Sequence, residues 1–329
     1  MITIKEIAKL ANASSSTVSR YLNDSGYVSE ETRKRIEKVI KSTGYVPSEQ
    51  AKSLRTKQTK VIGVIVPRLS TDTSSRLVNS INDILAEQGY QIILANTNLN
   101  PEKEIANLRL LRSRQVDGII LLATNINPTL IKEIENLTVP LVALGQEIPG
   151  ISVILNDDYQ AAKDMTKLFG EQSHQDIAFI GVSEQDRAVG HLRKKGFLDA
   201  MNELGLYVDP KWVAEAGFDL QSGYQAMKTI AEAKRQKPTA VFAVTDTIAI
   251  GAMHYLLEHG YDIPGDVAIA GTGNSRVSEY IRPALTTIDF SNELAGKQAA
   301  ELIIDQIGKK ELSIKKVVMP YSIIERDSV

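Results

Sequence analysis

Short apolar segments and longer amphipathic segments alternate along the chain from residue 61 to residue 319. The first apolar segment, Val61–Val66, is almost entirely β-branched and ends at Pro67, which indicates a buried strand. The segment 74–87 that follows has helical periodicity and stops before Gly89. Repeated alternation of this kind predicts a parallel β-sheet with helices on both faces and right-handed crossovers.

The same alternation continues to the end of the chain. We predict further strands at 91–95, 118–122, 139–144, 177–180, 240–244, 267–270, 285–288 and 315–319. We predict further helices at 101–114, 130–135, 159–169, 188–204, 222–232, 247–259 and 291–307. These elements fall into two sets, so the sequence predicts an α/β body built from two lobes.

The first 46 residues have a purely helical pattern. Thr3 and Glu6 fit a capping box at the start of a short helix with one apolar face. A tight break follows at 12–14. A later helix begins at Ser29, a residue type suited to an N-cap, and stops at Gly44.

Between them, residues 15–22 form a second short helix, in which Val18 and Leu22 can pack inward. Its other face is small, polar and cationic: Ser15, Ser16, Thr17, Ser19 and Arg20. Such a face suits the DNA major groove, where hydroxyls and a guanidinium meet phosphates and base edges. Three short helices with a tight turn predict a helix-turn-helix headpiece over 1–46. The alternative is a plain three-helix bundle with a solvated, serine-rich surface.

Several motifs, in one order and at matching spacing, resemble the LacI/GalR family of bacterial repressors. They are Thr3-Ile4-Lys5-Glu6-Ile7-Ala8, Ser16-Thr17-Val18-Ser19-Arg20-Tyr21-Leu22-Asn23, Gly26-Tyr27-Val28-Ser29, Gly44-Tyr45-Val46-Pro47, Ala51-Lys52-Ser53-Leu54-Arg55 and Val61-Ile62-Gly63-Val64-Ile65-Val66-Pro67. The resemblance implies a sequence-specific DNA-binding repressor with a two-lobed body of the periplasmic-binding-protein type. We accordingly predict headpiece contacts to DNA at Thr3, Ser15, Ser16, Thr17, Ser19, Arg20 and Ser29.

Residues 47–60 are predicted to form a hinge helix and linker. A helix over 48–54 has about two turns, too few to be stable alone in water. The resemblance implies that two such helices pack together in the minor groove, where Leu54 wedges between base pairs and Ala51 and Lys52 also contact DNA. It thus implies a homodimer on a near-palindromic operator. The alternative is that Leu54 packs on the core of the body.

The resemblance also implies that the chain crosses between the lobes three times, near Asp158, Asp289 and Pro320. The body, 61–329, would then divide into a first lobe of about 61–158 and 289–319 and a second lobe of about 159–288 and 320–329.

Polar residues that follow the predicted strands are candidates for a ligand site, because ligands of open α/β sheets bind at the carboxyl ends of strands. The polar residues at these positions are Arg68, Gln146, Glu147, Asp186, Arg187, Asp246, Thr272 and Asn274. Of these, our candidates for effector contacts are Arg68, Gln146, Asp246 and Asn274. Arg193, in Arg193-Lys194-Lys195-Gly196, matches the family's effector-contacting arginine. Each could instead lie in a solvated loop, and Asp246 could simply cap the helix after it.

The site motifs depart from the family pattern in two places. Thr245-Asp246 stands where Asn-Asp is frequent, and Gly271-Thr272-Gly273-Asn274 lacks the usual acidic contact. Arg68 adds a cation where many relatives are acidic. These changes favour an anionic ligand such as a phosphosugar.

Within the family, several segments look most like repressors of sucrose and trehalose operons. We predict a repressor of a carbohydrate-utilisation operon that is released by a sugar or phosphosugar, sucrose-type first and trehalose-type second. One alternative is a catabolite-control regulator with a phosphoprotein co-repressor, and another is a solute-binding protein.

Composition excludes other classes of protein. The chain has no cysteine, which excludes disulfides and thiolate chemistry. Residues 1–60 hold 12 Lys and Arg against 6 Asp and Glu, whereas the remainder holds 26 against 34, so a basic front end can meet phosphates. We find no signal peptide, membrane span, metal-ligand spacing or catalytic motif, and Gly271-x-Gly273 is too short for a nucleotide loop. We expect a cytoplasmic bacterial protein that is not an enzyme, with no cofactor and no metal.

Overall fold

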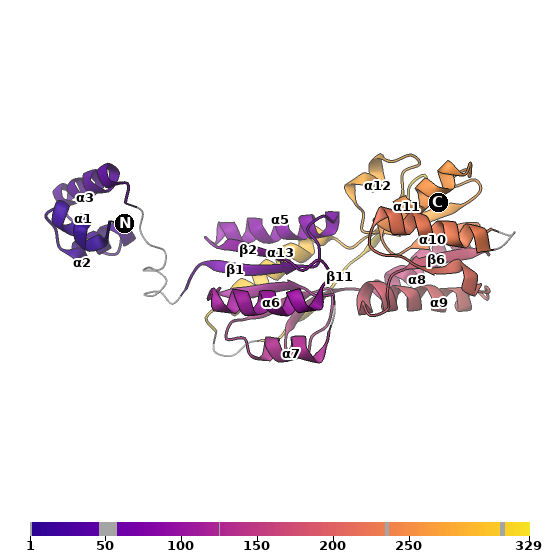
Figure 1. Cartoon of the computed structure of the whole chain (residues 1–329), viewed down its shortest axis with the longest axis horizontal. Helices are drawn as coiled ribbons and strands as arrows, with labels where there is room; N and C mark the ends of the chain where they lie inside the picture. The colour runs from indigo at the N-terminus through magenta and orange to yellow at the C-terminus, as the bar shows by residue number, and fades with distance from the viewer. Residues whose placement is uncertain (1, 46–57, 125, 234–236, 310–312) are drawn as a thin grey trace. The chain divides into compact units, whose positions relative to one another are not determined.

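The computed structural model describes residues 2–45, 58–124, 126–233, 237–309 and 313–329 (Figure 1). The chain forms two compact units, Met1–Thr59 and Lys60–Val329. The predicted hinge helix over 48–54 lies outside the described residues. No helix in the described ranges is long and apolar enough to cross a membrane.

The first unit is a three-helix headpiece, as predicted. Its helices are α1 (Ile4–Leu10), α2 (Ser15–Asn23) and α3 (Glu30–Thr43). Each begins at a residue whose hydroxyl accepts a backbone N–H three residues ahead: Thr3, Ser14 and Ser29. The helices bury a small apolar core around Ile7, Val18 and Ile36. Because each cap satisfies one of the free N–H groups of its helix, the boundaries are fixed locally.

The second unit contains two lobes, each with a six-stranded sheet. The first lobe has strand order β11-β5-β4-β3-β1-β2, and every neighbouring pair is parallel. Its strands are β1 (Val61–Val66), β2 (Gln91–Asn96), β3 (Gly118–Leu122), β4 (Leu141–Leu144), β5 (Ser152–Asn156) and β11 (Lys316–Met319). Helices α5 (Asp72–Glu87) and α13 (Asn292–Gln306) pack on one face, and α6 (Pro101–Ser113) and α7 (Pro128–Glu135) on the other (Figure 1).

The second lobe has strand order β12-β10-β9-β8-β6-β7, in which only β12 is antiparallel to its neighbour. Its strands are β6 (Ile177–Gly181), β7 (Val213–Glu215), β8 (Ala240–Ala243), β9 (Ala268–Thr272), β10 (Thr286–Asp289) and β12 (Ser322–Ile324). Its α-helices are α8 (Asp158–Glu171), α9 (Arg193–Glu203), α10 (Leu220–Ala233), α11 (Asp246–Glu258) and α12 (Arg276–Tyr280). Phe179 packs between Phe197 and Phe242 at the centre of its core, with the Phe179 and Phe197 rings 4.9 Å apart.

The predicted fold class is confirmed, but several elements were missed. The strands β7 and β12 have three residues each, which is too short for a two-residue period to be visible. The strand β5 follows directly on a turn at Gly150, which has φ 76°, and was left unassigned. The predicted helix 188–204 is two elements: a π-helical segment, Arg187–Leu192, leads into α9.

Three connections carry the chain between the two sheets. The strand β5 leads into α8, β10 leads into α13, and β11 leads into β12. As a result, the helix α13 packs against α5 of the first lobe, although the strand before it, β10, belongs to the second lobe. Residues on these connections therefore lie beside both lobes.

Candidate functional site

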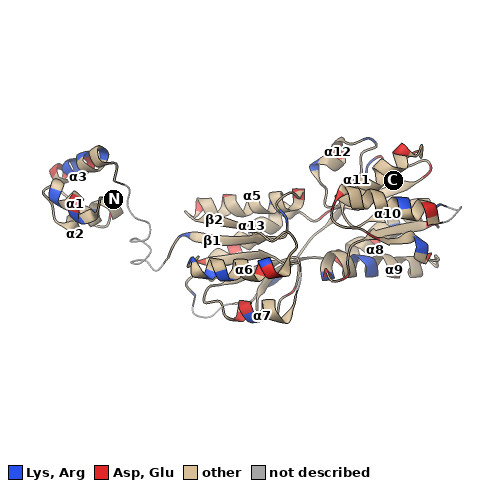
Figure 2. Ribbon diagram, viewed as in Figure 1, with Lys and Arg blue, Asp and Glu red and all other residues tan. Residues whose placement is uncertain are grey.

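The outward face of α2 carries the residues predicted to bind DNA. Ser15, Ser16 and Arg20 are exposed, Thr17 and Ser19 are half-buried, and Val18 is fully buried. The N-cap residue Ser14 organises this face, because its Oγ lies 2.7 Å from Ser16 Oγ and 2.8 Å from Thr17 Oγ1. Acidic side chains are absent from α2, whereas α3 carries both signs of charge (Figure 2). The exposed hydroxyls and the guanidinium of α2 thus form a surface suited to phosphates and base edges.

Thr3 and Ser29 are exposed but already engaged at their helix starts. Thr3 Oγ1 donates to Glu6 Oε2 at 2.9 Å, and Ser29 Oγ donates to Thr32 Oγ1 at 2.9 Å. The Thr3 backbone N–H, which also donates to Glu6, lowers the pKa of that carboxyl. Contacts from these two residues to phosphate remain predictions. The predicted contacts of Ala51, Lys52 and Leu54 lie outside the described residues.

A cavity of about 200 Å³ lies between the two lobes, with residues that follow strands of both sheets in its wall. The wall includes three of the five predicted effector residues: Arg68, Arg193 and Asp246. It also includes Asp186, which follows a predicted strand, and residues that the strand pattern did not indicate: Asp72, Thr124, Asn156, Phe218, Phe290 and Asn292. The carboxyl ends of two parallel sheets meet here, as ligand sites in open α/β folds require.

Arg193 is buried in this wall and holds the first crossing between the lobes. Its Nε donates to Asp158 Oδ1 at 2.7 Å, and its Nη1 donates to the carbonyl oxygen of Val244. The guanidinium lies over the ring of Phe290, 5.2 Å from the centroid. Burial raises the pKa of the Asp158 carboxyl, and the Arg193 charge opposes that rise. The pair is therefore neutral as a unit, and the N–H groups of Arg193 that remain can face a ligand.

Arg68 reaches across the cavity from the first lobe to the second. Its Nη1 donates to the Phe218 carbonyl oxygen at 2.6 Å, and the guanidinium lies over the Phe218 ring at 4.7 Å from the centroid. Burial lowers the pKa of this guanidinium. Phe218 could not be found from the sequence, because the short strand β7 that precedes it was not recognised.

Asp246 is 2% exposed and its carboxylate oxygens are already hydrogen-bonded. Thr287 Oγ1 donates to Oδ1 at 2.5 Å, and the Ser275 backbone N–H donates to Oδ2 at 2.6 Å. Burial raises the pKa of this carboxyl. The suggestion that Asp246 caps α11 is wrong, because the capping oxygen belongs to Thr245. Asp246 instead fixes the loop after β9 against β10.

Gln146 and Asn274 do not belong to the wall of this cavity. Gln146 is 3% exposed, and its Nε2 is buried without a hydrogen bond. The side-chain oxygen of Asn274 accepts a hydrogen bond from Arg326 Nη2 at 2.7 Å. The end of β4 before Gln146 was predicted correctly, and β9 before Asn274 ends two residues later than predicted. A position after a strand does not decide which way a side chain points. Effector contacts from these two residues remain predictions.

The charges in the wall nearly balance. The two guanidiniums, Arg68 and Arg193, are offset by the carboxylates of Asp72, Asp186 and Asp246. Burial raises the pKa of Asp186, whose Oδ1 accepts the backbone N–H groups of Ala188 and Val189. The cavity therefore combines carboxylates with aromatic rings, a lining suited to a ligand rich in hydroxyl groups.

A larger open groove, of about 760 Å³, runs along β7 and α10 in the second lobe. None of its described lining residues is a buried charged group. Among the described residues, no cluster of His, Asp and Glu could hold a metal ion. The cavity between the lobes is thus the better candidate for a ligand site.

A helix-turn-helix headpiece joined to a two-lobed body with a cavity between its lobes defines a ligand-responsive, DNA-binding regulator. Two family models match the chain. "Bacterial regulatory proteins, lacI family" matches residues 3–48, and "Periplasmic binding protein-like domain" matches residues 166–329. The chain belongs to the lacI family of bacterial regulatory proteins.

Its relatives share the whole architecture. The chain is 33% identical to the HTH-type transcriptional repressor PurR of Histophilus somni (strain 129Pt), over 94% of this chain and 93% of that one. It is 32% identical to catabolite control protein A of Priestia megaterium, over 99% of each. Among solved structures, a transcriptional regulator CelR–cellobiose complex is similar with a TM-score of 0.76, 27% identity and full coverage of both chains. The protein is a transcription regulator and not an enzyme, and regulators of this family bind operator DNA and small-molecule effectors.

We expect Asp158→Asn to lower the free energy of unfolding of the body by about 3–5 kcal/mol, because it leaves the Arg193 charge buried without its partner. Urea unfolding of the full chain, followed by fluorescence of its single tryptophan, Trp212, measures this. The control is Asp305→Asn, which removes an exposed partner of Lys309 and should change little because water screens the pair. Equal effects of the two substitutions would contradict a structural role for the buried pair.

Proposed function

We propose that this protein is a repressor of a carbohydrate-utilisation operon, and that a sugar bound between its lobes releases it from DNA. The observation that carries the proposal is the wall of the cavity, which combines the acidic residues Asp72, Asp186 and Asp246 with the aromatic residues Phe218 and Phe290. Carboxylates accept hydrogen bonds from hydroxyl groups, and an apolar ring face can cover the carbon skeleton of a sugar.

A disaccharide is our first class of effector, sucrose-type before trehalose-type. The segments that resemble sucrose and trehalose repressors support a disaccharide, and so does the similarity to a regulator in complex with cellobiose. The cavity of about 200 Å³ is smaller than the ~300–1,000 Å³ usual for ligand pockets. A disaccharide would therefore need side chains of the wall to move aside.

A phosphosugar is the second possibility within the same proposal. Arg68 is the cation that supports it, because its hydrogen bond in the structure goes to a backbone carbonyl and not to a carboxylate. The carboxylates of the wall oppose it, since they repel a phosphate. The similarity to a catabolite control protein keeps a phosphoprotein co-repressor as the alternative mode of control. The headpiece argues against a solute-binding protein.

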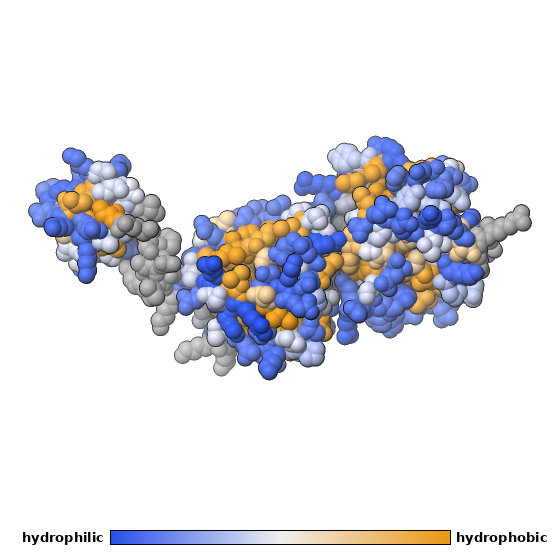
Figure 3. Space-filling view, in the orientation of Figure 1, coloured by the Kyte–Doolittle hydropathy of each residue, from blue (hydrophilic) through white to orange (hydrophobic). Residues whose placement is uncertain are grey.

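We propose that the repressor acts as a homodimer. The strand β2 lies at the edge of the first sheet, and its Ile93 and Leu94 are 40% and 38% exposed. Figure 3 shows an apolar area on the face of the first lobe that carries β2. An exposed apolar edge strand is a surface that natural proteins cover, and a second copy would bring two headpieces to two half-sites.

The proposed release from DNA follows from thermodynamic linkage between effector binding and operator binding. In this proposal, effector and operator favour different arrangements of the lobes. A ligand shifts such an equilibrium only through its different affinities for the two states. Coupling of this kind is typically about 1–3 kcal/mol and reciprocal, so operator DNA weakens effector binding by the same factor.

We expect Arg20→Ala and Ser16→Ala each to cost about 1–3 kcal/mol of operator binding free energy, because a contact to a base edge or phosphate is lost. Sugar affinity should not change. Fluorescence anisotropy with an operator selected from random DNA by the wild type measures the first quantity, and calorimetry measures the second. Lys41→Ala, which removes an exposed partner of Glu37 on α3, is the control. Unchanged operator affinity in both variants would show that α2 is not the recognition helix.

Titration calorimetry with sucrose, sucrose 6-phosphate, trehalose and trehalose 6-phosphate tests the effector. We expect at least one sugar to bind and to release operator DNA. Arg68→Ala should weaken a phosphorylated ligand much more than its plain form, because the guanidinium is the group available to the phosphate. Arg109→Ala, on α6 and paired with Glu133, is the control. Binding of none of the four sugars would overturn the carbohydrate assignment.

Sedimentation velocity of the full chain tests the dimer. The wild type should sediment as a dimer at micromolar concentration, and Leu94→Lys should shift it toward monomer because the charge would be buried in the interface. Leu198→Lys, at a similarly exposed leucine on α9, is the control. A wild-type monomer with full operator affinity would rule the dimer out.

A further inference from the structure

A single arginine on α5 connects the two lobes beside the cavity. We propose that Arg76 is a positioning residue for effector binding: its guanidinium holds the loop at 273–275 of the second lobe against the first lobe, and so stabilises the arrangement that encloses the effector. The inference rests on the proposed function for the identity of the ligand. The contacts that Arg76 makes are independent of the proposed function.

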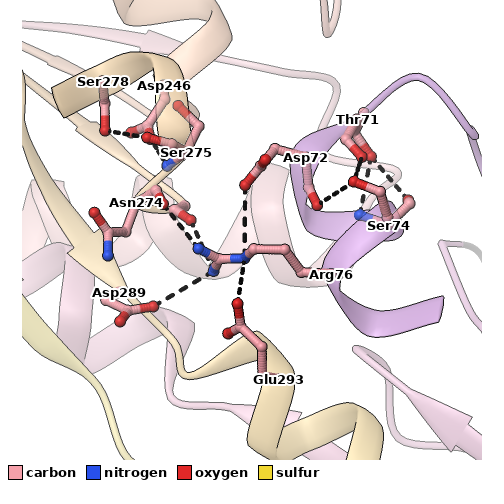
Figure 4. Close-up of polar contacts among 12 residues, drawn as sticks. Thr71, Asp72, Ser74, Arg76, Asp246, Asn274, Ser275, Ser278, Asp289 and Glu293 are labelled. Atoms are coloured by element: carbon pink, nitrogen blue, oxygen red, sulfur yellow. Dashed lines mark hydrogen bonds and ion pairs between the residues drawn. The ribbon is translucent and has the colours of Figure 1, made fainter. Parts of the chain in front are cut away.

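On the first-lobe side, Arg76 is anchored by carboxylates. Its side chain is only 10% exposed, and its Nε lies 3.5 Å from Asp72 Oδ2 and 3.3 Å from Glu293 Oε1. Asp72 is one helical turn earlier on α5, and Glu293 lies in the first turn of α13. Figure 4 shows the guanidinium between these side chains and the loop of the other lobe. Two elements of the first lobe therefore fix the direction of the arginine.

On the second-lobe side, the guanidinium binds backbone carbonyls. Nη1 donates to the Asn274 oxygen at 2.8 Å, and Nη2 donates to the Gly273 oxygen at 3.3 Å. Nη2 also lies 3.6 Å from Asp289 Oδ1, at the end of β10. A planar fork that serves two consecutive carbonyls fixes orientation as well as distance, which a lysine ammonium does not do.

The loop held in this way is under conformational constraint. Gly273 has φ 131° and Asn274 has φ 45°, both in the left-handed half of the backbone map. From the other side, Arg326 donates to the Asn274 side-chain oxygen at 2.7 Å. Asn274 is thus held between two guanidiniums, one from each lobe. This contact explains why Asn274 follows a strand at the site edge and still does not line the cavity.

The same loop forms part of the cavity wall. Gly273 and Ser275 line the cavity together with Asp72, the carboxylate that pairs with Arg76. The Ser275 N–H donates to Asp246 Oδ2 at 2.6 Å, so a shift of the loop also releases Asp246. Ser275 Oγ and Asp72 Oδ2 are buried without a hydrogen bond. The arginine therefore determines the placement of groups from both lobes around a ligand.

The contact between the two lobes at this point depends on the positive charge of Arg76. Without it, Asp72 and Glu293 of the first lobe would face Asp289 of the second with no cation between them. Like charges at a lobe contact favour separation of the lobes. Arg76 thus converts a repulsive contact into an attractive one, and its loss should shift the protein toward the open arrangement, in which the effector is not enclosed.

Hydrogen exchange of the ligand-free protein tests the contact itself. Arg76→Met keeps most of the length of the side chain and removes the charge, and we expect faster exchange of the Asn274 and Ser275 amides. Arg76→Lys keeps the charge without the fork and should be intermediate. Arg112→Met, at an exposed arginine on α6, is the control and should change neither amide. Wild-type exchange of this loop in Arg76→Met would overturn the proposal.

Calorimetry with sucrose, or with trehalose if sucrose does not bind the wild type, tests the consequence for the effector. We expect Arg76→Met to weaken sugar binding about tenfold, and to raise the sugar concentration that releases half of the operator DNA by a similar factor. Its operator affinity without sugar should be at least that of the wild type. Unchanged sugar affinity would overturn the positioning role. If neither sugar binds the wild type, the same titration uses sucrose 6-phosphate and trehalose 6-phosphate. If none of the four binds, the carbohydrate assignment fails, and the exchange experiment still decides whether Arg76 holds the loop.

Discussion

The body depends on one geometric constraint: the carboxyl ends of two parallel sheets face each other across a small cavity. Parallel strands place all their carboxyl ends at one edge, so loops distant in sequence converge there. Arg68 follows β1, Asp186 follows β6 and Thr272 ends β9, and all three line the same cavity. Two of the three connections between the lobes contribute to its wall, the first through Asn156 and the second through Phe290. A ligand in the cavity would therefore contact residues of both lobes.

Two guanidiniums at this contact lie beside carboxylates. The Arg193–Asp158 pair is buried and neutral, and the Arg76 guanidinium sits among Asp72, Asp289 and Glu293. Burying a lone charge costs several kcal/mol, so each guanidinium near the cavity needs partners that are already in place. Arg68 differs, since its partners are a carbonyl oxygen and the Phe218 ring. That difference makes Arg68 the cation with which a ligand can most readily interact.

The headpiece is organised by short-range interactions instead. Thr3, Ser14 and Ser29 each begin a helix by a contact to a residue three positions ahead, and Gly44 ends the last helix with φ 63°. Because these contacts are local, the polar face of α2 is set by its own few residues and by the burial of Val18. A small domain of this kind can present the same surface whatever the arrangement of the body.

The sequence by itself determined the headpiece and the alternation of strands and helices, because caps and hydrophobic periodicity act over a few residues. The family resemblance came from its motifs instead. It also predicted Arg68, Arg193 and Asp246, which the cavity brings together. Only the tertiary structure decided that Asn274 turns away toward Arg326, that Asp158 neutralises Arg193, and that Phe218 and Asp72 join the wall. Strand periodicity fixes where a loop begins. The direction of each side chain depends on partners more than 30 residues away, such as Asp158 for Arg193, and these meet only when the two lobes have folded.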